Sequence, residues 1–166
     1  MDLKVILGPN GSGKSLYAED LAVQCGTPRI YIATMVPQNE DNHRRIQKHR
    51  DQRRDKEFIT IEEPLCVSSV CVPLNSVVLL EDVSNLVANR IFGKQPGKYP
   101  SLLEDILTLA EHCKTLIAVS ISGMNPEEYT GETADYIRQL NELNVQLIQY
   151  ASEAVEMQNG IPVSLK

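Results

Sequence analysis

The chain has 166 residues, a hydrophobic fraction of 42% and a formal net charge of −6 at pH 7. At this length we expect one domain, residues 1–166, around a single core. The acidic balance disfavours binding to nucleic acid, and no apolar run approaches the roughly 18 residues that a membrane span requires. Because Met1 and Asp2 lead directly into an apolar run, we expect no signal peptide and a cytoplasmic location.

The segment 8–15 reads Gly-Pro-Asn-Gly-Ser-Gly-Lys-Ser and matches the G-x-x-x-x-G-K-S pattern of a phosphate-binding P-loop. The apolar run 3–7 before it predicts a buried parallel strand, and apolar residues at helical spacing follow it. Glycines let backbone N–H groups turn toward phosphate oxygens, while Lys14 would reach the β- and γ-phosphates and Ser15 would ligate Mg²⁺. The predicted nucleotide-binding residues of the loop are Gly8, Pro9, Asn10, Gly11, Ser12, Gly13, Lys14 and Ser15.

A second strand is predicted over residues 29–34, and the alternating segment 57–62 predicts a third. The segment between them, 37–56, is polar on nearly every face and holds seven of the sixteen basic residues. Its main apolar side chain is Ile46. This segment therefore cannot be a core helix.

The apolar strand predicted over 77–80 ends in Glu81 and Asp82. An apolar strand followed by carboxylates is the Walker B arrangement, which holds Mg²⁺ directly or through water. Strand ends are often acidic, so the signal gains its weight from the P-loop upstream. The predicted metal-binding residues are Ser15, Glu81 and Asp82.

The remaining predicted elements are a Gly-, Pro- and Lys-rich loop (93–100), a capped helix (101–112), a strand (115–119), a long helix (130–150) and a hairpin (155–158 with 161–165). Strands that alternate with helices predict an α/β fold, with a mostly parallel sheet covered on both faces. Ligands of such sheets bind beyond the carboxyl ends of the strands. We therefore expect residues 8–15, Thr34, Glu81, Asp82 and 120–124 to meet at one edge of the sheet.

If the basic segment is helical, Arg45, His49 and Arg53 lie on one face at i, i+4 and i+8. Two flanking cations lower the pKa of a histidine, which would leave His49 neutral with a free lone pair. Such a histidine can attack the α-phosphate of a nucleotide, form a covalent intermediate and expel pyrophosphate. The alternative is a solvated basic helix with an incidental histidine, which the spacing alone favours.

The order and spacing of these motifs resemble the bifunctional adenosylcobinamide kinase / adenosylcobinamide-phosphate guanylyltransferase family of cobalamin biosynthesis. The resemblance covers most of the chain. It departs from the family pattern at residues 121–124, where Ile-Ser-Gly-Met replaces Asn-Glu-x-Gly. The matching motifs are the P-loop, Tyr31-Ile32-Ala33-Thr34, Arg45-Ile46, His49-Arg50 with Arg53, Phe58-x-Thr60-x-Glu62-Glu63-Pro64, Leu79-Leu80-Glu81 with Asn89, Asn144, and the terminal Asn159-Gly160-Ile161-Pro162-Val163-x-Leu165-Lys166.

The resemblance implies a RecA-like P-loop NTPase fold in which one site phosphorylates a cobinamide and then transfers GMP to it through a guanylylated histidine. It implies GTP, ATP and Mg²⁺ as cofactors, a cobinamide-type corrinoid as substrate, and a homotrimer. His49 matches the guanylylated histidine, and Lys14 is the second predicted catalytic residue. Beyond the P-loop, the implied nucleotide-binding residues are Thr34, Met35, Val36, Arg50, Asp51, Gln52, Arg53, Glu62 and Glu81.

Two other functions stay open at this point. A P-loop kinase of another small molecule would transfer the γ-phosphate without a covalent step, and a non-catalytic relative would bind nucleotide without turnover. A Ras-type GTPase is disfavoured because no Asn-Lys-x-Asp motif is present. A RecA-like DNA-binding role is disfavoured by the acidic balance, although the basic segment keeps it open.

Overall fold

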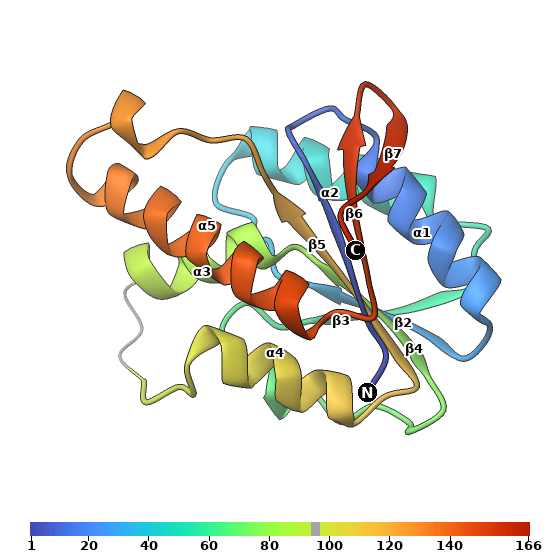
Figure 1. Ribbon diagram of the computed structural model, residues 1–166. Coiled ribbons are helices and arrows are strands. Elements are labelled where there is room, and N and C mark those ends of the chain that lie inside the picture. The colour runs from blue at the N-terminus through green and yellow to red at the C-terminus, as the bar shows by residue number, and fades with distance from the viewer. Residues whose placement is uncertain (94–96) are drawn as a thin grey trace.

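The computed structural model describes residues 1–93 and 97–166 and contains one seven-stranded sheet (Figure 1). The strands are β1 (Leu3–Gly8), β2 (Arg29–Ala33), β3 (Phe58–Glu62), β4 (Val77–Glu81), β5 (Thr115–Ile121), β6 (Glu153–Gln158) and β7 (Ile161–Ser164). The helices are α1 (Lys14–Cys25), α2 (Glu40–Gln52), α3 (Val83–Phe92), α4 (Leu102–Glu111) and α5 (Gly131–Tyr150), with short 3-10 turns at Val67–Ser69 and Pro126–Glu128.

The strand order is β3-β2-β4-β5-β1-β6-β7, and neighbouring strands are parallel except for the antiparallel β6–β7 pair. The predicted mostly parallel sheet and its C-terminal hairpin are therefore confirmed. Strand β5 lies between β1, which leads into the P-loop, and β4, which carries the predicted metal-binding acids. The residues that follow β1 and the acids at the end of β4 can therefore meet beyond the carboxyl end of β5.

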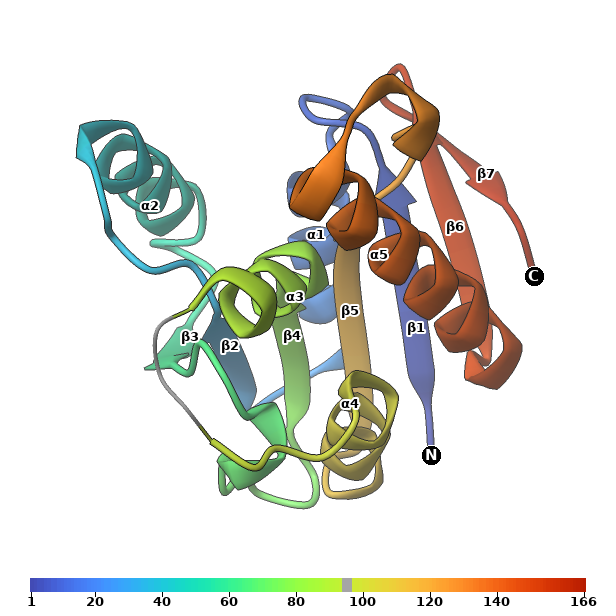
Figure 2. The ribbon, with the colours of Figure 1, turned by 90° about the vertical axis from the view of Figure 1, so that its left-hand side faces the viewer.

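Apolar side chains fill both faces of the sheet because successive residues of a strand point to opposite sides. On β4, Val78 and Leu80 face α3, α4 and α5, while Val77 and Leu79 face α1. Figure 2 shows the three helices in front of the sheet and α1 behind it. This covering on both faces is what a buried parallel sheet requires.

Helix α2 stands apart from these layers, beyond the ends of β2 and β3 (Figure 2). Its N-cap is Asn39, whose side chain accepts a hydrogen bond from the Asn42 amide at 2.8 Å. None of its 13 residues is buried, which confirms that the basic segment is not a core helix. The helix ends at Gln52 rather than continuing through residue 56.

The later elements follow the prediction, with one addition. Ser101 and Glu104 form the expected capping box at the start of α4. The predicted loop 93–100 falls in part on residues 94–96, which lie outside the described residues. Helix α3 was not predicted; its N-cap is Asp82, whose side chain accepts a hydrogen bond from the Asn85 amide at 2.6 Å. No helix within the described ranges is both long and apolar enough to cross a membrane.

The strand ends meet at one edge, as expected for parallel strands. The Ser122 amide donates to the Gly8 carbonyl at 3.2 Å, which joins the end of β5 to the P-loop. The Thr34 hydroxyl donates to the Asp82 carbonyl at 2.8 Å, which joins the end of β2 to the end of β4. The edge therefore brings four distant parts of the sequence into one place.

Asp105 on α4 carries a buried charge network that should dominate the stability of this side of the fold. Its carboxylate accepts from the amides of Val67 and Ser68 at 3.1 and 2.8 Å and pairs with Arg90. Replacing it with alanine would remove the carboxylate partner of Arg90 and leave the two amides without their acceptor. We expect Asp105→Ala to lower the free energy of unfolding by about 3–5 kcal/mol, measured by urea denaturation.

The exposed Asp135, which pairs with Arg138 on α5, provides the control. Asp135→Ala should change the free energy of unfolding by no more than about 0.5 kcal/mol. A loss below about 1 kcal/mol for Asp105→Ala would show that the network is not a major source of stability.

Candidate nucleotide-binding and catalytic site

The P-loop has the conformation that its glycines predict. Gly11 and Gly13 adopt φ values of 74° and 87°, which favour glycine, and α1 begins directly after the loop at Lys14. The Ser12 hydroxyl is buried and has no hydrogen-bond partner among the residues that the structure describes. Lys14 folds back so that its Nζ atom donates to the Pro9 carbonyl at 3.3 Å. A donor without a partner, a lysine and a helix N-terminus suit bound phosphate.

Glu81 ties the P-loop to the centre of the sheet. The Ser15 hydroxyl donates to its Oε1 atom, and the Tyr31 hydroxyl donates to Oε2 at 3.2 Å. The residue is only 7% exposed, and burial raises the pKa of its carboxyl. A serine hydroxyl beside a buried carboxylate is an oxygen donor set that fits Mg²⁺.

Asp82 lies next to this pair but already has a structural task. Its Oδ1 atom caps α3, and its own amide donates to the Thr34 hydroxyl at 2.8 Å. Burial raises the pKa of its carboxyl to about 6. Of the predicted metal-binding residues, Ser15 and Glu81 are in direct contact, while Asp82 has one oxygen engaged in the helix cap.

His49 reaches the same edge from α2. Its Nδ1 atom lies 3.7 Å from Glu81 Oε1, and its side chain is 22% exposed. Burial is the main cause that lowers the pKa of the imidazole; Arg53 and Arg45 lower it further, and Glu19 opposes them. The neutral histidine predicted from the two cations is thus supported, but desolvation contributes more than the cations do.

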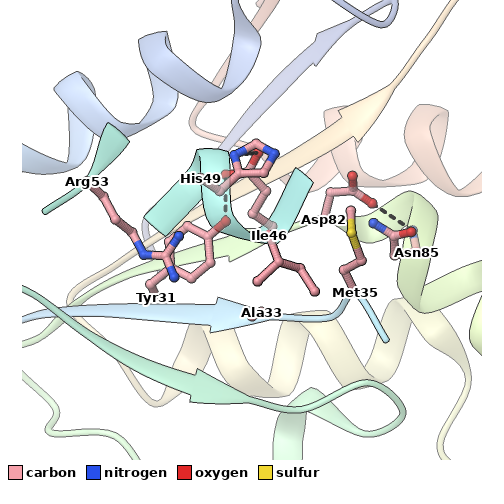
Figure 3. A pocket seen from close by; sticks show the side chains of 9 residues that line it. Tyr31, Ala33, Met35, Ile46, His49, Arg53, Asp82 and Asn85 are labelled. Atoms are coloured by element: carbon pink, nitrogen blue, oxygen red, sulfur yellow. Dashed lines mark hydrogen bonds and ion pairs between the residues drawn. The ribbon is translucent and has the colours of Figure 1, made fainter. Parts of the chain in front are cut away.

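Arg53, at the C-terminal cap of α2, fixes the end of the helix. Its guanidinium carbon lies 3.7 Å from the centre of the Tyr31 ring, and its Nη2 atom donates to the Thr60 hydroxyl at 3.2 Å. Tyr31 therefore contacts both Glu81 and Arg53, the residue that caps the helix carrying His49. Burial raises the pKa of the Tyr31 phenol. Figure 3 shows Tyr31 and Arg53 side by side below His49.

The other predicted nucleotide-binding residues form two further groups. Thr34 is buried at the edge, with Met35 and Val36 following it. Arg50 pairs with Glu62 at 3.3 Å on the exposed side of α2. Asp51 is exposed and accepts from the side chains of Gln47 and Arg54, while Gln52 has a buried Nε2 atom without a partner among the described residues. Arg50, Asp51 and Gln52 thus lie in the last turn of α2 rather than in the P-loop.

Two cavities flank the edge. The first, about 30 Å³, lies beneath His49 and has room for about one water molecule (Figure 3). The second, about 740 Å³, shares Met35 and Asn85 with it and lies between α2 and α3. Among the described residues that line the larger cavity, none is a lysine, arginine, aspartate or glutamate. Its walls include the amide side chains of Gln38, Asn42, Asn85 and Asn89 and the apolar side chains of Met35, Val36, Leu65 and Phe92.

Three residues that line the site have no predicted role of their own. Tyr31 appeared only as part of a strand motif, and Asn85 lies in the helix that was not predicted. Glu19 follows Ser15 by one helical turn and is fully buried. The available signal was the position of Glu19 among the apolar residues of α1. A charged residue there is seldom buried unless it has a partner, so its position could have indicated one.

Comparison with known proteins agrees with this geometry. Residues 4–165 match the family described as cobinamide kinase / cobinamide phosphate guanyltransferase. The chain belongs to this family. A relative, the bifunctional adenosylcobalamin biosynthesis protein CobP of Pseudomonas aeruginosa, is 43% identical over 65 residues, which are 39% of this chain and 37% of that protein. The aligned segment thus spans well under half of that relative.

Solved structures resemble this family member in fold. One ATPase domain has a TM-score of 0.55 and 10% identity, and the match covers 93% of this chain and 68% of that one. An ATPase of the type III secretion system of pathogenic bacteria has a TM-score of 0.52 and 10% identity, covering 98% and 56%. The predicted RecA-like P-loop fold is confirmed, and these identities are too low to carry more than the fold.

The raised pKa of Asp82 predicts a pH-dependent stability in this cobinamide kinase / guanyltransferase family member. A carboxyl whose pKa rises from 3.8 to about 6 on folding stabilises the fold fully below pH 3.8, and this stabilisation is lost as the pH rises through 6. Asp82→Asn keeps a capping oxygen but has no charge to bury. We expect the variant's gain in free energy of unfolding over the wild type to be larger at pH 8 than at pH 4.5 by about 2 kcal/mol.

Urea denaturation at the two pH values measures this difference, with the exposed Asp135→Asn as the control that should show none. An equal gain at both pH values for Asp82→Asn would contradict the burial of a charged carboxylate at this position.

Proposed function

We propose that the chain is a bifunctional enzyme that phosphorylates a cobinamide and then transfers GMP from GTP to the cobinamide phosphate through a covalent histidine intermediate. The observation that carries this proposal is the position of His49. It extends from an exposed helix to 3.7 Å from Glu81, which in turn contacts Ser15 of the P-loop. A solvated basic helix with an incidental histidine would not bury an imidazole against the phosphate-binding edge.

The kinase step would use the P-loop alone. Lys14 and the loop amides would hold the β- and γ-phosphates of ATP or GTP, and the cobinamide hydroxyl would attack the γ-phosphorus. Ser15, Glu81 and the free oxygen of Asp82 would hold Mg²⁺, which when bound neutralises charge on the phosphate oxygens. Family membership supports this step, because the family description includes a cobinamide kinase.

The guanylyl transfer would use His49. Its neutral nitrogen would attack the α-phosphorus of GTP, which forms an N–P bond and breaks the bond to the leaving pyrophosphate. The cobinamide phosphate would then attack the same phosphorus and release the imidazole. Thr34, Met35, Val36, Arg50, Asp51, Gln52, Arg53 and Glu62 would contact the rest of the nucleotide. In support, Arg50, Arg53 and Glu62 line an open hollow beside β3.

The 740 Å³ cavity between α2 and α3 is our candidate for the acceptor site. The described residues of its walls are neutral and include several amide side chains, which suits a large substrate that carries amide groups and hydrophobic faces. Because it shares Met35 and Asn85 with the cavity beneath His49, an acceptor bound there could reach the guanylylated histidine.

We further propose that residues 1–166 act as a single nucleotide-binding domain, that the protein works in the cytoplasm and that it assembles as a homotrimer. The edge strand β7 supports assembly, because its apolar side chains lie open to solvent. Ile161 and Val163 are 65% and 37% exposed, and Leu165 just after the strand is 44% exposed.

Incubation with Mg²⁺ and α-labelled GTP tests the covalent step. We expect the wild type to retain acid-labile label on His49 and the His49→Ala variant to retain less than about 1% of it, since no other nucleophile replaces the imidazole. His43→Ala is the matched control, because His43 lies on the same helix but is exposed. It should label as the wild type does.

Label on His49→Ala at the wild-type level would refute the covalent assignment. Transfer of γ-label alone, with no α-label on the wild type, would instead favour the kinase without a covalent step. Nucleotide binding without either transfer would favour the non-catalytic alternative.

The acceptor site is tested by filling the larger cavity. Ala88 on α3 lines it and is half-buried, so Ala88→Phe should project a ring into the space for the acceptor. We expect labelling of His49 to stay within about twofold of the wild type, while transfer of GMP to cobinamide phosphate falls at least about tenfold. The exposed Val145→Phe on α5 is the control. Unchanged transfer in Ala88→Phe would place the acceptor elsewhere.

A further inference from the structure

Glu19 is a fully buried carboxylate that the proposed steps do not use. It lies on α1 one helical turn after Ser15, with 0% of the residue exposed. Its Oε2 atom accepts from Lys56 Nζ at 2.9 Å, whereas Oε1 is buried and has no partner among the described residues. A buried carboxylate oxygen without a donor is costly, so a donor is expected to approach it during function.

The His49 ring is a candidate donor. Glu19, His49 and Glu81 each present one nitrogen or oxygen atom within 4.8 Å of the others'. The Nδ1 atom of His49 is buried and, within the described part of the chain, has no hydrogen-bond partner. Both oxygens of Glu81 already accept from Ser15 and Tyr31. Of the two carboxylates, Glu19 is the one with an oxygen that accepts no hydrogen bond from a described residue, so we take it as the candidate acceptor for the ring N–H.

We propose that Glu19 is a positioning residue that accepts the Nδ1–H bond of His49 in the reactive state, so that the lone pair for attack lies on Nε2. This inference rests on the proposed guanylylation of His49. Which ring nitrogen carries the proton is set by the hydrogen bond that the other atom makes. Contacts of this kind are often long in a nucleotide-free enzyme and shorten when the substrate binds.

The proposal balances without an added proton. The Nε2–phosphorus bond forms as the bond from the α-phosphorus to the pyrophosphate oxygen breaks, and pyrophosphate leaves with that electron pair. The ring keeps its Nδ1 proton and becomes positively charged opposite the Glu19 carboxylate. When a phosphate oxygen of the acceptor attacks the same phosphorus, the Nε2 lone pair returns and the ring is neutral again. Glu19 orients the ring and takes no proton from it, which is the role of the carboxylate in a hydrolase triad.

Lys56 gives Glu19 a fixed place in this arrangement. It follows α2 in sequence and bonds both Glu19 and Asp20 of α1 at 2.9 Å. The carboxylate is thus linked through Lys56 to the chain segment that follows α2, the helix that carries His49. Its effect on the ring competes with other groups around the imidazole. Those groups are Glu81 of β4, Asp82 directly after it, Tyr31 of β2, Arg45 of α2 and Arg53 at the C-terminal cap of α2.

A variant pair separates positioning from simple structure. Glu19→Gln removes the charge that faces the ring, and Asp20→Asn removes the neighbouring charge, which bonds the same lysine but is exposed. For Glu19→Gln we expect single-turnover labelling of His49 by α-labelled GTP to fall at least about 100-fold. Its acidic limb should also move to lower pH, because loss of the carboxylate destabilises the protonated ring. Asp20→Asn should stay within about threefold, with an unchanged pH profile.

Nitrogen-15 NMR of the protein bound to Mg²⁺ and α,β-methylene GTP, which cannot release pyrophosphate, gives a readout that does not depend on activity or on a variant of Glu19. Replacing His43 and His112 with glutamine leaves His49 as the only one of three histidines. We expect the neutral ring to carry its proton on Nδ1. A neutral ring with the proton on Nε2 would overturn the proposal.

The failures are distinguishable. No label on the wild type would overturn the proposed function and the role of Glu19 with it. Label on wild type and Glu19→Gln at equal rates and with equal pH profiles would overturn the role of Glu19 alone. Glu19→Gln should melt within a few degrees of the wild type, which shows that it folds. If it does not fold, Glu19→Asp replaces it: this variant keeps the charge and should keep the acidic limb of the wild-type pH–rate profile.

Discussion

The buried carboxylate of Glu81 is the interaction on which the site depends. It accepts from Ser15 of the P-loop and from Tyr31 of β2, and it lies 3.7 Å from His49 of α2. Three segments that are far apart in sequence therefore meet at one charged group. Burial of that charge is unfavourable by itself, and the two hydroxyl donors offset part of the cost.

The P-loop with Glu81 and the helix α2 differ in how extensively packing holds them in place. The P-loop and Glu81 extend from strands at the centre of a sheet whose faces are covered by helices. Helix α2 has no buried residue, so little apolar surface holds it in place. Its position rests instead on polar and ring contacts near its C-terminal end, where Arg53 stacks on Tyr31 and Lys56 bonds to Glu19. We therefore expect α2 to adjust around a bound nucleotide more easily than the P-loop does.

Glycine at position 8 illustrates how little room the packing around the P-loop leaves. A Cβ atom there would lie 2.4 Å from the Ser12 hydroxyl and 3.1 Å from the Met157 carbonyl. The first neighbour is a side-chain atom, but the second is the backbone of β6. The first glycine of the motif is thus required by packing of the loop against the sheet, as well as by the ligand.

Features with a local signal were predictable from the sequence. The P-loop, the strand before it and the C-terminal hairpin each depend on residues that are close together in the chain. Helix α3 was not predicted, because Asp82 was interpreted as a metal ligand, and its side chain also caps that helix. An aspartate after a strand can be a metal ligand or the N-cap of a helix, and the sequence pattern alone does not separate these two roles.

The contacts that assemble the site are the part that sequence could not supply. Glu19 meets Lys56 across 37 positions and faces His49 from another helix. Helical spacing placed Arg45, His49 and Arg53 on one face but could not say that this face turns toward the P-loop. That orientation depends on tertiary contacts. Because the contacts bury the ring, burial lowers the pKa of His49 more than the neighbouring cations do.

The most direct test of the account is a crystal structure of the protein with Mg²⁺ and α,β-methylene GTP, an analogue that cannot release pyrophosphate. The account predicts the triphosphate in the P-loop with the His49 Nε2 atom about 3–3.5 Å from the α-phosphorus, in line with the bond to the leaving group. An imidazole that stays against Glu81 with no path to the α-phosphorus, or a triphosphate bound away from the P-loop, would contradict it.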